Sequence, residues 1–167
     1  MNRQQEKNYM SLSVQTLQDI EKIKILKARY CYLADAGIAG DTSKYDELLA
    51  LFTDDAKVDF VGIGVWEGKT AIGGFFKDLV NSLWSYASHM VMNPIIEVEG
   101  IEAKGLWRVH CLATTRKTNQ AVWIHGDYEE TYLKVGSDWK WKSIKFSSDF
   151  YSPYDEGWAK TKMITLE

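Results

Sequence analysis

The sequence predicts an α+β domain in which a cone-like curved antiparallel sheet wraps around N-terminal helices and encloses an apolar pocket. Apolar residues recur at helical spacing in the first half of the chain and alternate with polar residues in the second half, which is typical of helices followed by a run of strands. Of the 167 residues, 46% are hydrophobic and 13% aromatic. This supply of aromatic rings suits either a ligand cavity or a thickly packed core.

The helices are predicted from steps of three and four between apolar residues. In the first helix these residues are Leu17, Ile20, Ile23, Leu26, Tyr30 and Leu33. Gly37 and Gly40 predict its end. The run Asp41-Thr42-Ser43 can cap a second, short helix, and a third helix is expected over about residues 69–83.

The strands are predicted from alternation. Ala56, Val58 and Phe60 alternate with charged residues and indicate a half-buried first strand. Four antiparallel strands are then expected at 88–98, 104–116, 120–134 and 139–151, with turns at Gly100 and at residues 117–119 and 136–138. Because the alternation changes parity within the last strand, a bulge is expected near Ser143.

Alternation also predicts which side chains face the first helix. After Gly105 the more apolar face carries Trp107, Val109, Cys111 and Ala113. On the next strand the inward set is Val122, Ile124, Gly126, Tyr128 and Tyr132. The outward set there is Trp123, His125, Asp127 and Glu129.

We expect one domain at 15–153, with a polar arm at 1–14 and a tail at 154–167. The net charge is −3 and no segment gathers Lys and Arg alone, so a nucleic-acid partner is not expected. Nor is a membrane partner, because the apolar runs are too short to span a bilayer. Residues 1–9 lack the apolar core of a signal peptide. Cys31 and Cys111 form no CxxC pair, and free thiols suit a cytoplasmic location.

Several spaced motifs occur in order over residues 18–155. They are Ile23-x2-Leu26-x3-Tyr30-x4-Asp35, Asp46-x2-Leu49-x2-Phe52-Thr53-Asp54-Asp55-Ala56, Trp66-x-Gly68-x3-Ile72, and Gly126-x-Tyr128-x3-Tyr132-x6-Trp139-Lys140 followed by Asp149-Phe150-Tyr151-Ser152-Pro153. Together they resemble the SnoaL-like branch of the nuclear-transport-factor-2-like superfamily. Similar members of that branch are scytalone dehydratase, the bile-acid 7α-dehydratase and the hexachlorocyclohexane dehydrochlorinase.

The resemblance implies a lyase without a cofactor, in which a helical Asp and a strand-borne His form a catalytic dyad. Asp35, five residues after Tyr30, and His89, five before Pro94, match these positions. Tyr30 matches a position that is polar in the relatives and is the third catalytic candidate, which could hydrogen-bond a carbonyl or protonate the leaving group. A core Tyr with its hydroxyl bonded elsewhere explains it about as well. By parity and by the resemblance, the pocket lining is expected to be Trp84, Trp107, Val109, Cys111, Ile124, Tyr128, Phe146 and Ser148. The substrate implied is small and hydrophobic, polycyclic or terpenoid-like.

The dyad makes chemical sense, because a carboxylate on the far ring nitrogen of a histidine stabilises the imidazolium that forms when a proton arrives. From the residues alone, a helix-capping Asp35 and a core His89 are the better explanation, and it is the family resemblance that favours the dyad. The lining residues are equally explained as plain core. The sequence departs from the relatives at Ala113 and Ile144, where scytalone dehydratase has a second His and the dehydrochlorinase an Arg.

Three functions therefore stay open: a dehydratase, an isomerase that uses the same dyad, and a non-catalytic ligand-binding or assembly domain. No metal is expected, because His110, His125, Asp127 and Glu129 lack a metal-binding spacing. Trp123, Leu106 and Leu112 on the outward face favour an interface over a solvated surface. The resemblance implies a homotrimer through this face, with a dimer as the alternative.

Overall fold

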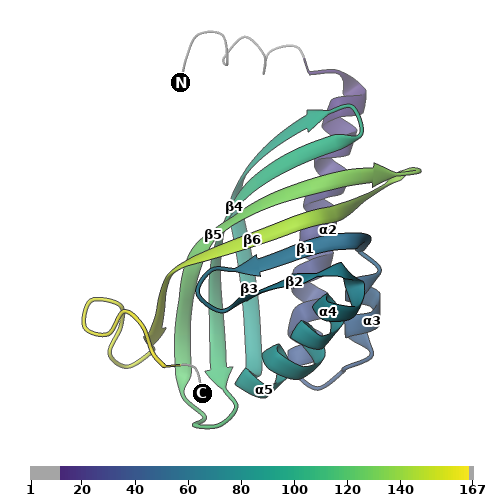
Figure 1. Cartoon of the computed structure of the whole chain (residues 1–167). Helices are drawn as coiled ribbons and strands as arrows, with labels where there is room; N and C mark the ends of the chain where they lie inside the picture. Colours follow the sequence, from purple (N-terminus) through teal and green to yellow (C-terminus); the bar gives the residue numbers. More distant parts are fainter. Residues whose placement is uncertain (1–11, 166–167) are drawn as a thin grey trace.

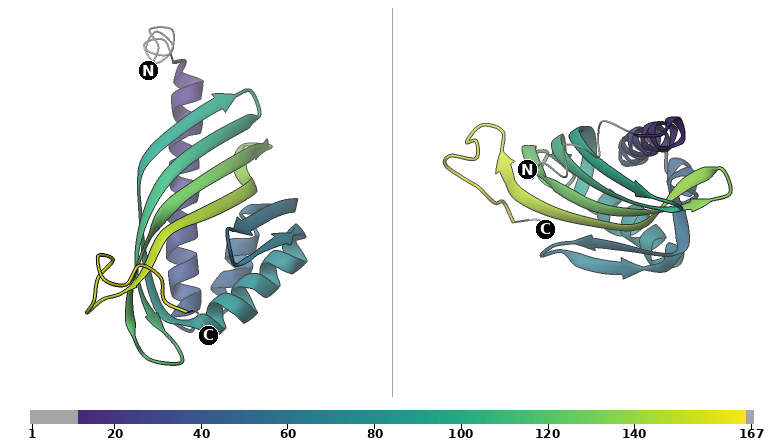
Figure 2. Two further views of the ribbon diagram at one scale, coloured as in Figure 1. Left: turned by 60° about the vertical axis from the view of Figure 1, so that its left-hand side comes forward. Right: turned by 90° about the horizontal axis from the view of Figure 1, so that it is seen from above.

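The first long helix determines where the sheet can close. In this computed structural model, which describes residues 12–165, helix α2 (Val14–Ile38) lies against a sheet that curves along it (Figures 1 and 2). The side chain of Ser13 accepts a hydrogen bond from the Thr16 backbone N–H and caps the helix. The helix therefore begins before Leu17, the first residue of the apolar pattern. Residues 1–11 of the predicted arm lie outside the described range.

The remaining helices are short. Helix α3 (Lys44–Leu49) follows Gly40, whose φ of 116° suits glycine. Ser43 occupies its N-cap position, but the hydroxyl donates to Asp41 and not to the helix. The single helix predicted over 69–83 is wrong in detail, because the chain forms α4 (Gly68–Gly74), a π-helix η1 (Phe75–Val80) and α5 (Asn81–Leu83). The wider π turn buries the adjacent rings of Phe75 and Phe76 together.

The described residues form a sheet of six strands in the order β2-β1-β6-β5-β4-β3. The strands are β1 (Phe52–Phe60), β2 (Gly64–Glu67), β3 (Trp84–Glu99), β4 (Glu102–Thr115), β5 (Ala121–Val135) and β6 (Asp138–Pro153). The predicted antiparallel meander over β3 to β6 is confirmed. The first strand, β1, differs by pairing with β6 in parallel, because α4, η1 and α5 carry the chain across to the opposite edge before β3 begins (Figure 1).

Two bulges bend β6 against β5. The first leaves Lys142 as the extra residue, next to Ser143, where a bulge is predicted. The second leaves Asp149 extra, beside Gly126. A Cβ atom at Gly126 would lie 2.3 Å from the Ser147 carbonyl oxygen, so this close approach of the two strands requires glycine. Each bulge increases the local twist and curvature of the sheet.

The inner face of the sheet follows the predicted alternation. Every residue predicted to face inward on β4 and β5 is buried. These side chains pack with buried residues of α2, including Ile23, Leu26 and Tyr30. The core therefore lies between the concave face of the sheet and the helices.

The tail of the chain packs against the sheet. The ring of Tyr154 stacks on Trp123 and that of Trp158 on Phe150, with centroids 5.4 and 5.3 Å apart. Met163 forms a parallel bridge with Tyr151. Among residues 12–165, no helix is both long enough and apolar enough to cross a bilayer.

Candidate active site

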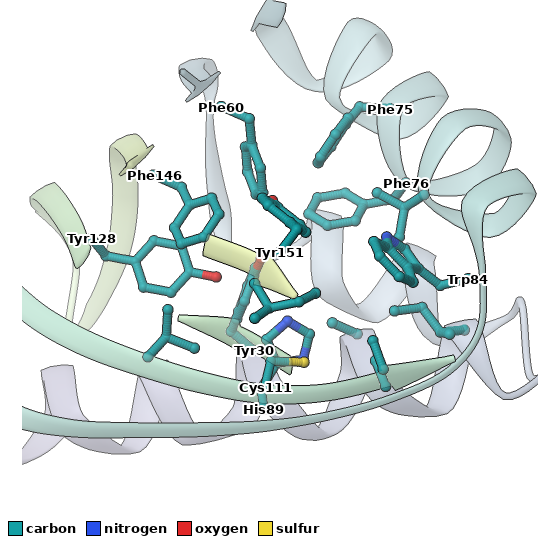
Figure 3. A pocket seen from close by; sticks show the side chains of 17 residues that line it. Tyr30, Phe60, Phe75, Phe76, Trp84, His89, Cys111, Tyr128, Phe146 and Tyr151 are labelled. Atoms are coloured by element: carbon teal, nitrogen blue, oxygen red, sulfur yellow. The ribbon is translucent and has the colours of Figure 1, made fainter. Parts of the chain in front are cut away.

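An apolar cavity of about 70 Å³ lies between the inner face of the sheet, α2 and η1 (Figure 3). Its aromatic walls are formed by Phe60, Phe75, Phe76, Trp84, Phe146 and Tyr151. Six of the lining side chains carry polar atoms: Tyr30, Trp84, His89, Cys111, Tyr128 and Tyr151. A larger hollow of about 430 Å³, lined by Glu97, Glu99 and Glu102 among others, contains neither His nor Cys. The chemistry is therefore concentrated in the smaller cavity.

Asp35 and His89 are in direct contact at this cavity. The Nδ1 atom of His89 lies 2.5 Å from Asp35 Oδ1. The backbone N–H of His89 donates to Asp35 Oδ2 at 3.0 Å. Because an ionised carboxylate only accepts hydrogen bonds, Nδ1 carries a proton and Nε2 is the nitrogen left for the pocket. The two bonds fix both the tautomer and the ring orientation.

The fold explains how residues so far apart in sequence meet. Asp35 occupies the last turn of α2, and His89 lies on the inner face of β3, against which α2 packs. The side chains of His89 and Asp35 are 16% and 24% exposed, so neither stands in bulk solvent. Asp35 does not line the cavity itself but lies behind His89.

The surroundings of His89 favour its charged form. Burial alone would lower the pKa of the imidazole. Its neighbours Cys111 and Asp35 instead raise the pKa of His89 well above 6.5. The site therefore stabilises the imidazolium form of His89.

Two of the tyrosines contribute to the polar part of the cavity. Tyr30 lies an ideal-helix rotation of about 140° from Asp35, yet both residues reach His89. Asp35 contacts the imidazole through Nδ1, while the Tyr30 ring packs edge-on with its centroid 6.3 Å away. Burial raises the pKa of Tyr30 and of Tyr128. Both hydroxyls therefore stay protonated and can donate a hydrogen bond.

Most of the predicted lining residues reach the cavity. They are Trp84, Val109, Cys111, Ile124, Tyr128 and Phe146. Trp107 and Ser148 do not. Trp107 has the inward parity but lies two residues before Val109 on β4, which places it roughly 7 Å from Val109 along the strand, beyond the end of the cavity. Ser148 pairs with Gly126 beside the bulge in β6 and is half-buried there.

Behind the cavity lies a buried ion pair that the sequence reasoning missed. Lys27 Nζ lies 2.5 Å from Glu130 Oε1, and the two side chains are 2% and 0% exposed. The Tyr132 hydroxyl donates to the other oxygen of Glu130 and accepts from Trp107 Nε1 at 2.9 Å. Lys27 also lies 3.5 Å from the centroid of the Tyr128 ring. Spacing contained the signal, because Lys27 falls within the apolar stripe of α2 and Glu130 has the inward parity of β5.

The outward histidines have partners of their own. His125 Nδ1 lies 2.8 Å from Asp149 Oδ2, and the His110 ring packs on Trp123 with centroids 5.1 Å apart. Within residues 12–165, no group of three or more His, Cys, Asp or Glu is arranged to hold a metal ion.

Comparison with known families decides the relationship. The SnoaL-like domain matches residues 15–145. The chain belongs to the SnoaL-like family. No curated protein matches it at the level of sequence.

Several solved structures share the fold of this SnoaL-like protein. A putative scytalone dehydratase from Novosphingobium aromaticivorans is 23% identical, with a TM-score of 0.72 over 83% of this chain and 89% of that one. The hexachlorocyclohexane dehydrochlorinase LinA-type3 from Novosphingobium barchaimii is 22% identical, with a TM-score of 0.71 over 82% and 90%.

A nuclear transport factor 2-like superfamily protein from Salmonella enterica serovar Typhimurium is 20% identical, with a TM-score of 0.71 over 85% and 99%. At these identities the likeness establishes the fold. These structural neighbours include dehydratase-type and dehydrochlorinase-type proteins.

This SnoaL-like site has its own distribution of charge. Ile144 on β6 is 1% exposed, and its neighbours Lys142 and Lys145 pair outward with Asp55 and Glu129. Among the described lining residues, His89 is the one whose side chain, free in solution, has a pKa near neutrality. The hydrogen-bond donors that this lining offers are therefore His89, Trp84, Cys111 and the hydroxyls of three tyrosines.

Proposed function

We propose that this protein is a lyase that eliminates water from a small hydroxylated apolar substrate without a cofactor. The observation that carries the proposal is the contact of Asp35 with both Nδ1 and the backbone N–H of His89 at an aromatic cavity. Such an arrangement is more than core packing requires. It fixes one tautomer, contributes to the raised pKa of His89 and leaves Nε2 directed to a cavity with aromatic walls.

An elimination needs one proton removed from carbon and one delivered to the leaving hydroxyl. The Asp35–His89 pair supplies this acid–base function, and general acid–base catalysis contributes roughly 10²–10⁴-fold. Tyr30 and Tyr128 are neutral donors on the same cavity. They are placed to hydrogen-bond a carbonyl or the leaving oxygen, which supports a substrate that carries oxygen next to the carbon that loses the proton.

The walls favour an apolar substrate, and its size requires movement. The cavity of about 70 Å³ is below the roughly 300–1,000 Å³ of common ligand sites. A polycyclic or terpenoid-like substrate therefore requires η1, which carries Phe75 and Phe76, to move away from the sheet. A π-helix interrupts regular helical packing and is frequent at functional sites, which makes this segment the natural moving wall.

The test is incubation of the protein with a panel of hydroxylated polycyclic and terpenoid-like compounds, read by mass spectrometry. Loss of the mass of water by the native chain, and its absence with His89→Ala, is the expected result. A product of unchanged mass but altered retention time would favour the isomerase, because the same pair can return a proton to a different carbon. Binding of compounds with no product in either protein would favour a ligand-binding domain and contradict the lyase.

We further propose that the chain assembles as a homotrimer through the outward face of β3 and β4. Met90, Met92, Ile95 and Leu106 on this face are 39%, 41%, 52% and 49% exposed. Ile95 pairs with Leu106 across the ladder, and Met90 and Met92 alternate along the same face of β3. A contiguous exposed apolar patch of this kind marks an interaction surface. Light scattering is expected to give three times the 19.2 kDa of one chain; a monomer would contradict any assembly, and a dimer would contradict the trimer alone.

A further inference from the structure

One buried polar group near the cavity has no role in the site described above. Tyr45 lies on α3 and is 0% exposed. Its hydroxyl is one of three buried side-chain polar atoms that have no hydrogen-bond partner within residues 12–165, together with Thr53 Oγ1 and Trp141 Nε1. Burying a polar group without a partner costs stability, so each such group requires an explanation. Thr53 and Trp141 lie on strands of the sheet, whereas the Tyr45 ring packs against η1, which lines the cavity.

The Tyr45 ring is held between two elements that border the cavity. On one side it stacks on Phe76 of η1, with centroids 6.1 Å apart and an angle of 24° between the rings. On the other side it covers Gly37 of α2, where a Cβ atom would lie 2.3 Å from Tyr45 Cε1 and 2.5 Å from Cζ. This close approach requires glycine at position 37. Because Cζ carries the hydroxyl, the polar end of Tyr45 lies at the junction between α2 and η1.

Helix α2 places this hydroxyl away from the Asp35–His89 contact. The residues of α2 that line the cavity are Tyr30, Ala34 and Ile38. Asp35 and Gly37 are about 200° apart around an ideal helix, one on each side of that lining stripe. Asp35 turns toward His89 on β3, whereas Gly37 faces Tyr45 on α3. The cavity therefore has the acid–base pair on one side and the unpaired hydroxyl on the other.

The Phe76 ring separates Tyr45 from the cavity. Phe76 lines the cavity, and Figure 3 shows its ring reaching inward from the helical wall. Tyr45 lies one ring further back and does not line the cavity. The movement of η1 proposed above takes Phe76 with it, whereas Tyr45 stays with α3, which packs against α2. The space that opens for a substrate is then bordered by the Tyr45 ring and its hydroxyl.

The chemistry of this group selects a neutral acceptor. Burial raises the pKa of Tyr45 to about 12, so the hydroxyl keeps its proton at neutral pH and can donate a hydrogen bond. Arg116, the cation whose charge acts on Tyr45, already donates to the backbone carbonyl oxygens of Asn81 and Trp84. In an apolar cavity a carbonyl oxygen is favoured over a carboxylate, whose charge is costly to bury.

We propose that Tyr45 is a substrate-binding residue that donates a hydrogen bond to a carbonyl oxygen on the part of the substrate remote from His89. This inference rests on the proposed lyase function and on its moving wall. It narrows the substrate class to polycyclic or terpenoid-like compounds that carry a second oxygen, on a ring other than the one that loses water. The hydroxyl is unpaired in the closed protein because its partner arrives with the substrate.

The first test separates a hydroxyl kept for binding from one kept for the fold. Tyr45→Phe retains the ring and removes the unpaired hydroxyl, so the melting temperature is expected to rise by roughly 2–4 °C. Tyr132→Phe is the matched control, because the Tyr132 hydroxyl bonds to Glu130 and Trp107, and its melting temperature should fall. A fall of similar size in Tyr45→Phe would show that the hydroxyl serves the fold and would overturn the inference.

The second test measures binding with two ketones of the same two-ring skeleton. They are 2-decalone, with one carbonyl, and decalin-2,6-dione, with a carbonyl on each ring. Isothermal titration calorimetry of the native chain is expected to show roughly tenfold tighter binding of the dione, the value of one hydrogen bond to an otherwise unpaired donor. Tyr45→Phe should lose this preference. Tyr32→Phe, whose side chain is 78% exposed, is the control and should keep it.

The outcomes distinguish this inference from the lyase itself. Neither ketone carries a leaving hydroxyl, so binding is read without turnover. Equal affinities of the native chain for the two ketones, no binding of either, or a preference for the dione that persists in Tyr45→Phe would each overturn the role of Tyr45. The lyase would still stand on the loss of water that His89→Ala abolishes, and it fails separately if no compound in the panel loses water.

Discussion

Two ionic contacts, eight residues apart on the same helix, behave differently. The Lys27–Glu130 pair is buried, with side chains 2% and 0% exposed. Glu130 also accepts a hydrogen bond from Tyr132, and the Lys27 ammonium lies over the ring of Tyr128. Asp35–His89 is partly open, with side chains 24% and 16% exposed, and the imidazole lines a cavity.

The difference separates a structural charge pair from a reactive one. A buried pair whose every polar atom has a partner gives rigidity and has no atom free to act on a ligand. The Asp35–His89 contact leaves Nε2 on the cavity, beside Cys111. Removing a partner from the first pair should therefore damage the fold, and removing a partner from the second should damage the chemistry.

The largest effect is expected from His89→Ala. Turnover should fall by roughly 10²–10⁴-fold because the acid–base group is lost, whereas the melting temperature should stay close to that of the native chain because His89 faces a cavity. Steady-state kinetics and thermal unfolding of the same preparation measure both. Equal losses of stability and activity would show that His89 is a core residue, with a structural role like that of Lys27.

Lys27→Met should show the opposite pattern. It leaves the Glu130 carboxylate buried without its cation, which costs about 3–5 kcal/mol of unfolding free energy, measured by urea denaturation. The double variant Lys27→Met/Glu130→Leu is the control, because replacing a whole buried pair by apolar residues is often close to neutral. A double variant no more stable than the single one would show that the fold depends on the hydrogen bonds of Glu130 beyond the pair.

A smaller, pH-dependent effect is expected at Asp19, near the start of α2. Burial alone would raise its pKa, but hydrogen bonds from Lys134, Trp139 and Gln15 lower the pKa from 3.8 to about 2. The lowered pKa stabilises the fold above about pH 4, and this contribution is lost as the pH falls through about 2. It amounts to about 2 kcal/mol.

Asp19→Asn tests this contribution. The variant should be less stable than the native chain at neutral pH by about 2 kcal/mol, and the gap should close as the pH falls. Urea denaturation at several pH values measures the gap. A difference that stays constant down to the acid limit would mean that the ionised form of Asp19 contributes nothing.

These contrasts also mark what the sequence could predict. Periodicity is a local property, so α2, the β3–β6 meander and the inward faces of β4 and β5 follow from it. Parity predicts which face of the sheet a side chain occupies but not how far along the strand the cavity extends. Trp107 therefore faces inward, as predicted, but does not line the cavity. The π-helical turn at Phe75 depends on packing against the sheet and leaves no distinct pattern.

The buried charges were missed for a related reason. Lys27 and Glu130 occupy inward positions by helical spacing and by strand parity, but each, taken alone, is a charged residue expected at the surface. Only their pairing makes the burial favourable. The Asp35–His89 contact could be anticipated through the family resemblance, whereas the place of Cys111 beside His89 needed the register of β3 against β4.

The central claim is that contact with Asp35 stabilises the protonated form of His89 at the cavity, and nuclear magnetic resonance titration of the three histidines tests it most directly. With signals assigned by single His→Gln variants, His89 should titrate well above 6.5 and His110 below it, because burial and the charge of His125 lower the pKa of His110. Asp35→Asn should shift the His89 titration downward and leave that of His110 unchanged. A native His89 that titrates at or below 6.5 would contradict the account.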